Sequence, residues 1–200
     1  TLIAENTSLY INATGGVGKN TYLDMYRESR YLRPNTIVKH SYTPFAIDGG
    51  AKIGVIDGFR IDVFGGYKKT EDEYFLILQS KELNKYQEFL TPIFGELSHS
   101  HIGARIHSNI WSPLDVAVQV KKNFYSVSKI KGLNTEPTEL KAWNKAGLEV
   151  NIDAAFSVTE DLKVMLNYYL GNERWSIYKG ESIKMEDINN LSLGAIYNIH

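Results

Sequence analysis

The C-terminal half of this 200-residue chain alternates apolar and polar residues with a period of two. The run "LEVNIDAAFSV" from Leu148 shows the pattern most clearly, and runs within 114–127, 161–172 and 188–199 repeat it. Successive side chains of a β-strand point to opposite faces of a sheet, so such runs form strands with one apolar and one polar face. The alternation therefore predicts an all-β fold.

The links between the expected strands are short and long in turn. Eight strands are predicted, at 8–20, 45–55, 59–68, 86–107, 114–127, 147–158, 161–172 and 188–199. Short turns are expected near 56–58, 108–113 and 159–161, long loops near 24–43, 68–85, 129–146 and 172–187, and a short helix within 21–32. Short links join antiparallel neighbours, so the order predicts an antiparallel up-and-down meander in a single barrel domain or barrel segment over residues 1–200.

One stretch, "TGGVGKNT" at 14–21, resembles the glycine-rich loop that binds nucleotide phosphates. It departs from that loop because Ala13 replaces the first glycine and Asn20 replaces the hydroxyl residue that binds magnesium. The loop also belongs to folds with repeated strand–helix units, which this chain does not predict. Its glycines are therefore interpreted as strand glycines that mark bends or close backbone approach.

Composition argues against several classes of function. The formal net charge is −1 and no run is rich in Lys or Arg, so no nucleic-acid partner is expected. The absence of Cys excludes disulfides, thiolate metal sites and cysteine nucleophiles. No apolar run has the length of a transmembrane helix, and the first residues do not resemble a signal peptide, so any targeting segment is expected outside this chain. The 13 Tyr residues are typical of β-proteins and suit membrane interfaces.

Reactive side chains do not form a familiar catalytic pattern. Three histidines share one strand face, His99, His101 and His107, but no carboxylate lies between them at ligand spacing, so a polar strand face is favoured over a zinc site. Ser98 and Ser100 lack the G-x-S-x-G context of a hydrolase. Three aspartates could be catalytic carboxylates but are interpreted as salt-bridge partners of basic residues: Asp62, Asp115 and Asp153 with Arg60, Arg105 and Lys121. We therefore expect no enzymatic activity, no cofactor and no metal.

Alternation alone leaves the environment of the two faces open. In an outer-membrane barrel the apolar face contacts lipid and the polar face lines the lumen, where we place Arg60, Asp62, His101, Arg105, His107, Asp115, Lys121, Asp153 and Lys163. In a soluble barrel the faces are exchanged, and the protein would bind a small hydrophobic or saccharide ligand. A third hypothesis is an outer-membrane enzyme with its site at the end of the barrel that carries the long loops.

Aromatic residues and long loops favour the membrane. Aromatic residues gather near the predicted strand ends, as in the girdles of membrane barrels: Phe45, Phe59, Tyr67, Phe124, Tyr125, Tyr168, Tyr169 and Tyr197. The long loops exceed what a compact soluble barrel usually carries without a function. On the loop side, Trp143 and Trp175 either contact a ligand or pack. Four apolar residues are expected to face lipid: Val118, Ile152, Leu166 and Leu193.

Two parts of the chain resemble a known family. The run from Glu139 to Gly171, followed by "INNLSLGAIYNI", resembles the barrel of TonB-dependent-receptor-like outer-membrane proteins of Gram-negative bacteria. "GGVGKNTYLDMYRESRYLRP" is similar to an upstream strand and loop of the same proteins. The resemblance implies an outer-membrane location, a role in nutrient uptake, and contacts with membrane lipid, with further barrel and plug segments and with an energy-transducing periplasmic partner.

The chain departs from this family in two respects. No plug segment and no segment that would contact the periplasmic partner is visible, and such receptors are several times longer. The sequence also stops at Ile199-His200, where the family would continue into another turn and strand. We therefore expect a fragment of a larger barrel, although eight strands could also close on their own.

Overall fold

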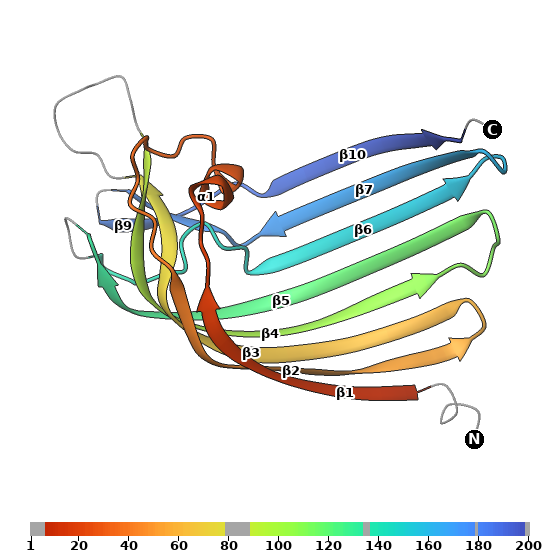
Figure 1. The fold of residues 1–200 in the computed structure, drawn as a ribbon, viewed down its shortest axis with the longest axis horizontal. Helices are drawn as coiled ribbons and strands as arrows, with labels where there is room; N and C mark the ends of the chain where they lie inside the picture. Colours follow the sequence, from red (N-terminus) through yellow and green to blue (C-terminus); the bar gives the residue numbers. More distant parts are fainter. Residues whose placement is uncertain (1–6, 79–88, 134–136, 179, 199–200) are drawn as a thin grey trace.

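The computed structural model describes residues 7–78, 89–133, 137–178 and 180–198. Its main element is an eight-stranded sheet made of β1 (Thr7–Gly18), β2 (Ser41–Ile56), β3 (Phe59–Leu78), β4 (Leu90–Ser108), β5 (Leu114–Lys131), β6 (Leu148–Ser157), β7 (Leu162–Asn172) and β10 (Ile188–Tyr197). A short helix, α1 (Tyr22–Glu28), follows β1, and a separate hairpin of β8 (Trp175–Tyr178) and β9 (Glu181–Lys184) lies between β7 and β10 (Figure 1).

The predicted antiparallel meander is confirmed. The strand order in the sheet is β1-β2-β3-β4-β5-β6-β7-β10, and every pair of neighbours is antiparallel. The predicted short turns are present between β2 and β3, between β4 and β5 and between β6 and β7. In the first of them Gly58 has a φ of +78°, a left-handed conformation that glycine adopts without strain. The predicted helix is also present, although it is shorter than the range 21–32.

The predicted long loops contain more regular structure than expected. The loop prediction over 68–85 is wrong in its first half, because β3 continues to Leu78 and pairs with β4 beyond a bulge between Thr70 and Glu73. The bulge adds residues to one strand only, which breaks the period-two pattern that defined the strand in the sequence. The rest of that loop, 79–85, and the expected start of β4, 86–88, lie outside the described residues. The loop predicted at 172–187 contains the β8–β9 hairpin.

The glycine-rich stretch at 14–21 is not a phosphate-binding loop. Its glycines lie in β1, which is hydrogen-bonded to β2. A side chain at Gly15 would bring its Cβ to 3.0 Å from the carbonyl oxygen of Pro44, and one at Gly18 would come within 2.6 Å of Ser41 Oγ. The interpretation of these residues as strand glycines with close backbone approach is therefore confirmed.

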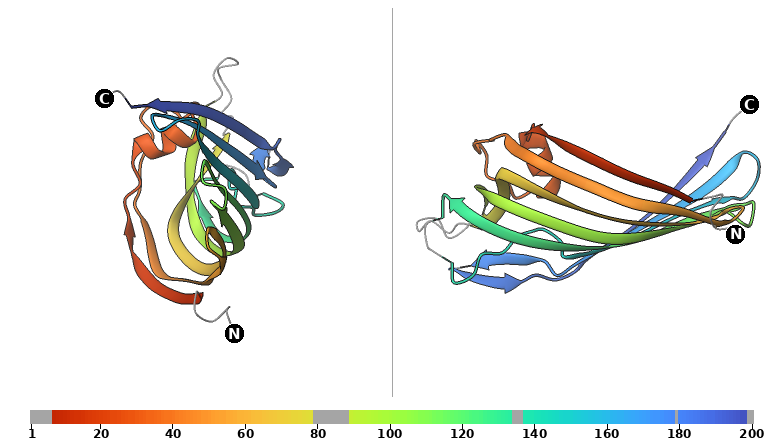
Figure 2. Two further views of the ribbon diagram at one scale, coloured as in Figure 1. Left: turned by 90° about the vertical axis from the view of Figure 1, so that its right-hand side faces the viewer. Right: turned by 90° about the horizontal axis from the view of Figure 1, so that it is seen from below.

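The sheet forms a curved trough rather than a closed barrel. In the described part of the chain β1 pairs only with β2 and β10 only with β7, so these two strands form opposite edges (Figure 2). The short turns lie at one end of the trough, where β1 begins and β10 ends. The other end carries α1 and the β8–β9 hairpin, and we call it the loop end (Figure 1).

One face of the sheet is apolar across all eight strands. The register aligns Ile106, Val118 and Ile152 on β4, β5 and β6, and it aligns Leu166 on β7 with Leu193 on β10. Leu193 is 72% exposed, and the other predicted lipid-facing residues are partly exposed. In the described part of the chain, exposed aliphatic side chains of this face include Leu9, Ile11, Val63, Ile102, Ile106, Val120, Val164, Leu191 and Leu193.

The buried core lies at the loop end, on the two sides of the extended β3–β4 hairpin. On one side Met25 of α1 packs against Leu32 and Leu76. On the other side Phe75 and neighbouring residues pack against Trp143 and Ile177. Phe75 and Leu76 are consecutive in β3, and consecutive strand residues point to opposite faces. The hairpin is therefore sandwiched between α1 and the segment that contains Trp143.

Helix α1 is fixed at both ends. At its start the Thr21 side chain and Asp24 form a capping box, which satisfies backbone N–H groups of the first turn. Near its end Glu28 accepts a hydrogen bond of 2.7 Å from the Tyr74 hydroxyl. Burial first, and then this hydrogen bond, raises the pKa of Tyr74, so the hydroxyl remains a donor at neutral pH. In the described part of the chain no helix is long and apolar enough to cross a membrane.

Candidate functional site

Strand pairing places the nine polar residues predicted for the lumen on one face of the sheet. Directly paired residues of antiparallel strands point to the same side. The register pairs Asp62 with Arg105 and Arg105 with Gln119, and Gln119 shares its side with Lys121, two residues further on. The same pairs and alternation, applied from β3 to β7, add the remaining residues: Arg60, His101, His107, Asp115, Asp153 and Lys163.

This polar face is the concave one. A cavity of about 350 Å³ at the loop end is lined by side chains of β3 to β7, β10 and α1, among them Lys68, His99, Tyr125, Glu149, Tyr169, Ile188 and Glu28. A cavity shared by so many strands and by α1 can lie only inside the curve of the sheet. Lys68 precedes the β3 bulge, and it lies an even number of residues from Arg60 and Asp62. His99, Tyr125, Glu149 and Tyr169 are related in the same way to the predicted residues of their own strands, so these lining residues share the face of the nine predicted residues. The candidate site is therefore the concave face, with its cavity at the loop end.

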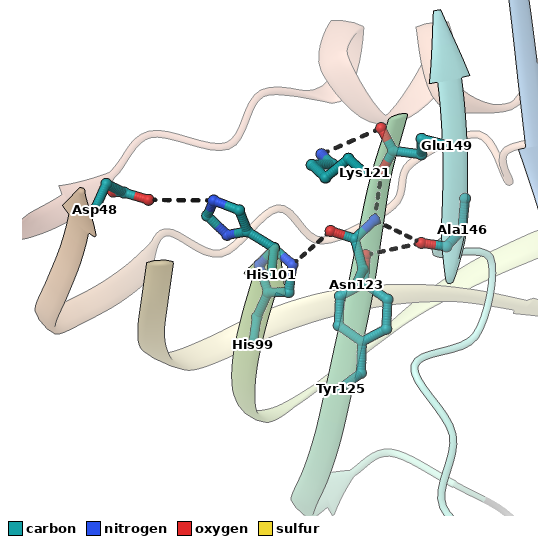
Figure 3. Close-up of polar contacts among 8 residues, drawn as sticks. All are labelled: Asp48, His99, His101, Lys121, Asn123, Tyr125, Ala146 and Glu149. Atoms are coloured by element: carbon teal, nitrogen blue, oxygen red, sulfur yellow. Dashed lines mark hydrogen bonds and ion pairs between the residues drawn. The ribbon is translucent and has the colours of Figure 1, made fainter. Parts of the chain in front are cut away.

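Asn123 of β5 is the centre of a polar network beside this cavity (Figure 3). Its side chain is buried, and its amide nitrogen donates to the carbonyl oxygen of Ala146 at 3.0 Å and to Glu149 Oε1 at 2.7 Å. Both partners are acceptors, so the amide orientation is fixed and the amide oxygen must accept. It lies 2.9 Å from His99 Nε2, which is therefore the protonated nitrogen of that ring.

An aromatic stack supports the same network. The His99 ring stacks on Tyr125, with 4.7 Å between ring centroids. The Tyr125 hydroxyl donates to the carbonyl oxygen of Ala146 at 3.1 Å, so this oxygen accepts from both Asn123 and Tyr125. These contacts connect β4 and β5 to Ala146 in the link that precedes β6, and they fix the relative positions of His99, Tyr125 and Ala146, which line the cavity.

We expect Asn123→Ala to lower the free energy of unfolding by about 1–3 kcal/mol, because it leaves buried donors and acceptors without partners. The matched control is Asn167→Ala, since Asn167 lies on the same face but is exposed and makes one side-chain bond, 2.7 Å to Asp153. Denaturant unfolding of both variants measures the difference. Equal losses in the two variants would contradict the role of Asn123 as the centre of the network.

Ion pairs follow the concave face, but only one of the predicted pairs is present. Arg60 and Asp62 pair at 2.9 Å as predicted. The predictions for Asp115 and Asp153 are wrong: Asp115 pairs with His107 at 3.0 Å, and Asp153 accepts a hydrogen bond from Asn167. The predicted partner of Asp153, Lys121, pairs instead with Glu149 at 3.2 Å. Alternation identifies the shared face, whereas the choice of partner depends on which residues the register places side by side.

The three histidines of β4 point to the same face but have different neighbours. His99 contacts Asn123, His101 lies 3.5 Å from Asp48 and His107 lies 3.0 Å from Asp115. Within the described ranges no three His, Asp or Glu side chains come together as metal ligands would. Each of the three side chains thus makes a polar contact with a different partner along the strand.

The two tryptophans of the loop end occupy different environments. Trp143 is 0% exposed, packs edge-on against Phe75 at 6.2 Å and donates its indole N–H to Ser182 Oγ at 3.2 Å. This burial favours packing over ligand contact for Trp143. Trp175 is partly exposed, lies under the Lys141 ammonium at 4.9 Å and lines a second cavity of about 420 Å³.

Two residues assigned to an aromatic girdle lie elsewhere. Tyr125 and Tyr169 line the concave cavity, which corrects their prediction as girdle residues. Each follows another aromatic residue, Phe124 or Tyr168, and consecutive strand residues cannot share a face. The same parity places Asn123 on the concave side, so the alternation already contained a signal for this residue.

Comparison with family models and with curated protein sequences gives no relative. No family model matches the chain, and no curated protein is significantly similar to it in sequence. The function must therefore be argued from the two faces of the sheet and the cavity.

Proposed function

We propose that this chain is a segment of an outer-membrane β-barrel that takes part in nutrient uptake in the manner of TonB-dependent receptors. Its convex apolar face contacts lipid, and its concave polar face lines the lumen. The observation that carries the proposal is the exposed apolar face that crosses the described sheet from β1 to β10. The uptake role is supported by the sequence resemblance alone.

The extent of the apolar face argues for lipid. Soluble monomeric proteins rarely expose a contiguous apolar patch larger than a few hundred Å². Here exposed apolar side chains extend from Leu9 and Ile11 at one edge of the sheet to Leu191 and Leu193 at the other. The face continues across directly paired residues, so it is one surface rather than scattered side chains.

The direction of curvature favours the membrane barrel over the soluble alternative. A soluble barrel that binds a small hydrophobic or saccharide ligand encloses its apolar residues and exposes its charges. In this sheet the charged residues are on the inside of the curve, and Val118 and its neighbours are on the outside. A polar concave face with ion pairs suits a water-filled lumen.

Single-cysteine labelling tests the proposal, because the natural chain has no Cys. A polarity-sensitive fluorophore is attached at Ile106→Cys and, as the matched control, at Arg105→Cys, which is the preceding residue on the opposite face. In lipid vesicles we expect blue-shifted emission and quenching by lipid-attached nitroxides at position 106 only. The probe at position 105 is expected to respond to aqueous iodide instead.

Two results would overturn the assignment. The first is that both probes respond equally to iodide and neither responds to the lipid quencher. The second is that the chain folds as a stable monomer in buffer without detergent or lipid, with the apolar face buried.

A further inference from the structure

We propose that the cavity at the loop end of the concave face binds a small anionic ligand through Lys68 and Arg174. The ligand would carry a carboxylate or a phosphate group. The conclusion that the lumen admits such a ligand rests on the proposed function. Binding of the ligand to the folded chain can be measured without it.

The charges that line the cavity are unevenly paired. Its lining includes three carboxylates and three cations: Glu28, Glu73 and Glu149 with Lys68, Lys145 and Arg174. Glu73 pairs with Lys145 at 2.7 Å, and Glu149 pairs with Lys121 at 3.2 Å. Glu149 also accepts from Asn123, so it is doubly occupied. These two carboxylates are therefore neutralised within the protein.

Lys68 and Arg174 are the cations that remain. Within the part of the chain that the structure describes, neither side chain has an ion pair or a hydrogen bond. The third carboxylate, Glu28, already accepts the hydrogen bond of Tyr74. The six charged residues of the lining sum to zero, but Lys121 outside the lining neutralises Glu149, so Lys68 and Arg174 outnumber the one lining carboxylate left without an ion pair among the described residues, Glu28. Both cations are donors that bind anions.

The rest of the lining also offers donors. The Tyr169 hydroxyl has no hydrogen-bond partner among the described residues, and it lines the same cavity. The Tyr169 phenol adds a third donor to those of Lys68 and Arg174, and Glu28 is the one carboxylate of the lining that forms no ion pair with a described residue. The volume of about 350 Å³ is at the lower end of ligand sites, which limits the ligand to a small molecule.

The cavity and its free cations come from distant parts of the chain. Lys68 is in β3 and Arg174 lies between β7 and β8, and the hydrogen bond from Met185 N–H to the Arg174 carbonyl fixes the backbone there. With the backbone fixed at both positions, ligand binding costs mainly the rotamer freedom of the two side chains.

Calorimetric titration of the folded chain in detergent tests the proposal with three probes: inorganic phosphate, succinate and glucose. We expect saturable binding of at least one anion and none of neutral glucose. Lys68→Gln and Arg174→Gln are each expected to raise Kd about tenfold, the equivalent of one charge-assisted hydrogen bond. The matched control is Lys184→Gln on β9, which removes an exposed lysine outside the cavity and is expected to leave Kd unchanged.

The outcomes separate the ligand classes. Tighter binding of phosphate assigns a phosphate-bearing ligand, and tighter binding of succinate assigns a carboxylate. Tyr169→Phe, which removes one hydroxyl and keeps the ring, is expected to weaken binding of the same anion and keeps the test valid if a Gln variant fails to fold.

Three results would overturn the inference: no saturable binding of either anion, equal weakening by Lys184→Gln, or glucose binding as tight as anion binding. The inference and the proposed function fail separately. If the probe at position 106 reports water while anions still bind through Lys68, only the membrane assignment falls. If that probe reports lipid and no anion binds, only the ligand assignment falls.

Discussion

Val118→Arg is expected to lower the free energy of unfolding in a lipid bilayer by about 2–4 kcal/mol, the cost of a charged side chain on the lipid face near the bilayer midplane. Val118 is paired with Ile106 and Ile152, so the guanidinium would be surrounded by apolar side chains on both sides. Nothing among the described residues on this face offers a carboxylate to Arg at that position. Reversible urea unfolding of the chain in vesicles measures the loss.

The matched control is Gln119→Arg, one residue further along β5 and on the opposite face. Gln119 is paired with Arg105 and Asn151 on the polar concave side, where water can solvate the new charge. We expect a loss of about 0.5–1 kcal/mol, which includes repulsion between the new guanidinium and Arg105 directly opposite. Equal losses at the two positions would show that the faces do not differ in environment.

The main sheet was predictable because its signal is local. Each strand carries its own alternation, and a shift of one residue would move every side chain of a strand to the other face. The faces of Asp62, Arg105 and Asp153 could therefore be predicted without knowing which strands pair. The short Asp57-Gly58 link likewise contains its own turn signal.

The loop end was harder to predict because its structure depends on distant contacts. The extension of β3 beyond Thr70 is stabilised by β4 and by residues on both faces, and the bulge hides it from a period-two search. The β8–β9 strands have four residues each, too few for alternation to stand out. Their contacts with Trp143 and with the β3 extension are not visible in local sequence.

The concave site was predicted as a face but not as a set of partners. Alternation placed Asp115 and Lys121 correctly on one side, yet their partners are His107 and Glu149. The acceptor at Ala146 is a backbone carbonyl in a link, which no side-chain pattern reveals. Burial of Trp143 in turn depends on how that link folds back over the sheet.

Trp143→Ala is expected to lower the free energy of unfolding by about 3–5 kcal/mol, the usual loss when a large aromatic side chain is removed from a core. Trp143 is fully buried among residues of β3, β4, β5 and β8, so its removal leaves a cavity that several elements share. The hydrogen bond from the indole to Ser182 is lost as well. Denaturant unfolding of the folded chain measures the change.

The matched control for this variant is Trp175→Ala, which removes the same side chain from a partly exposed position nearby. Its loss is expected to be clearly smaller, and a loss as large as that of Trp143→Ala would contradict the packing described for Trp143. Because Trp143 contacts only the loop end, we expect faster amide hydrogen exchange in Trp175–Tyr178, Glu181–Lys184 and the β3 residues beyond Thr70. Exchange in the β3 residues near Phe59 is expected to remain slow, since their hydrogen bonds to β2 and β4 do not depend on the indole.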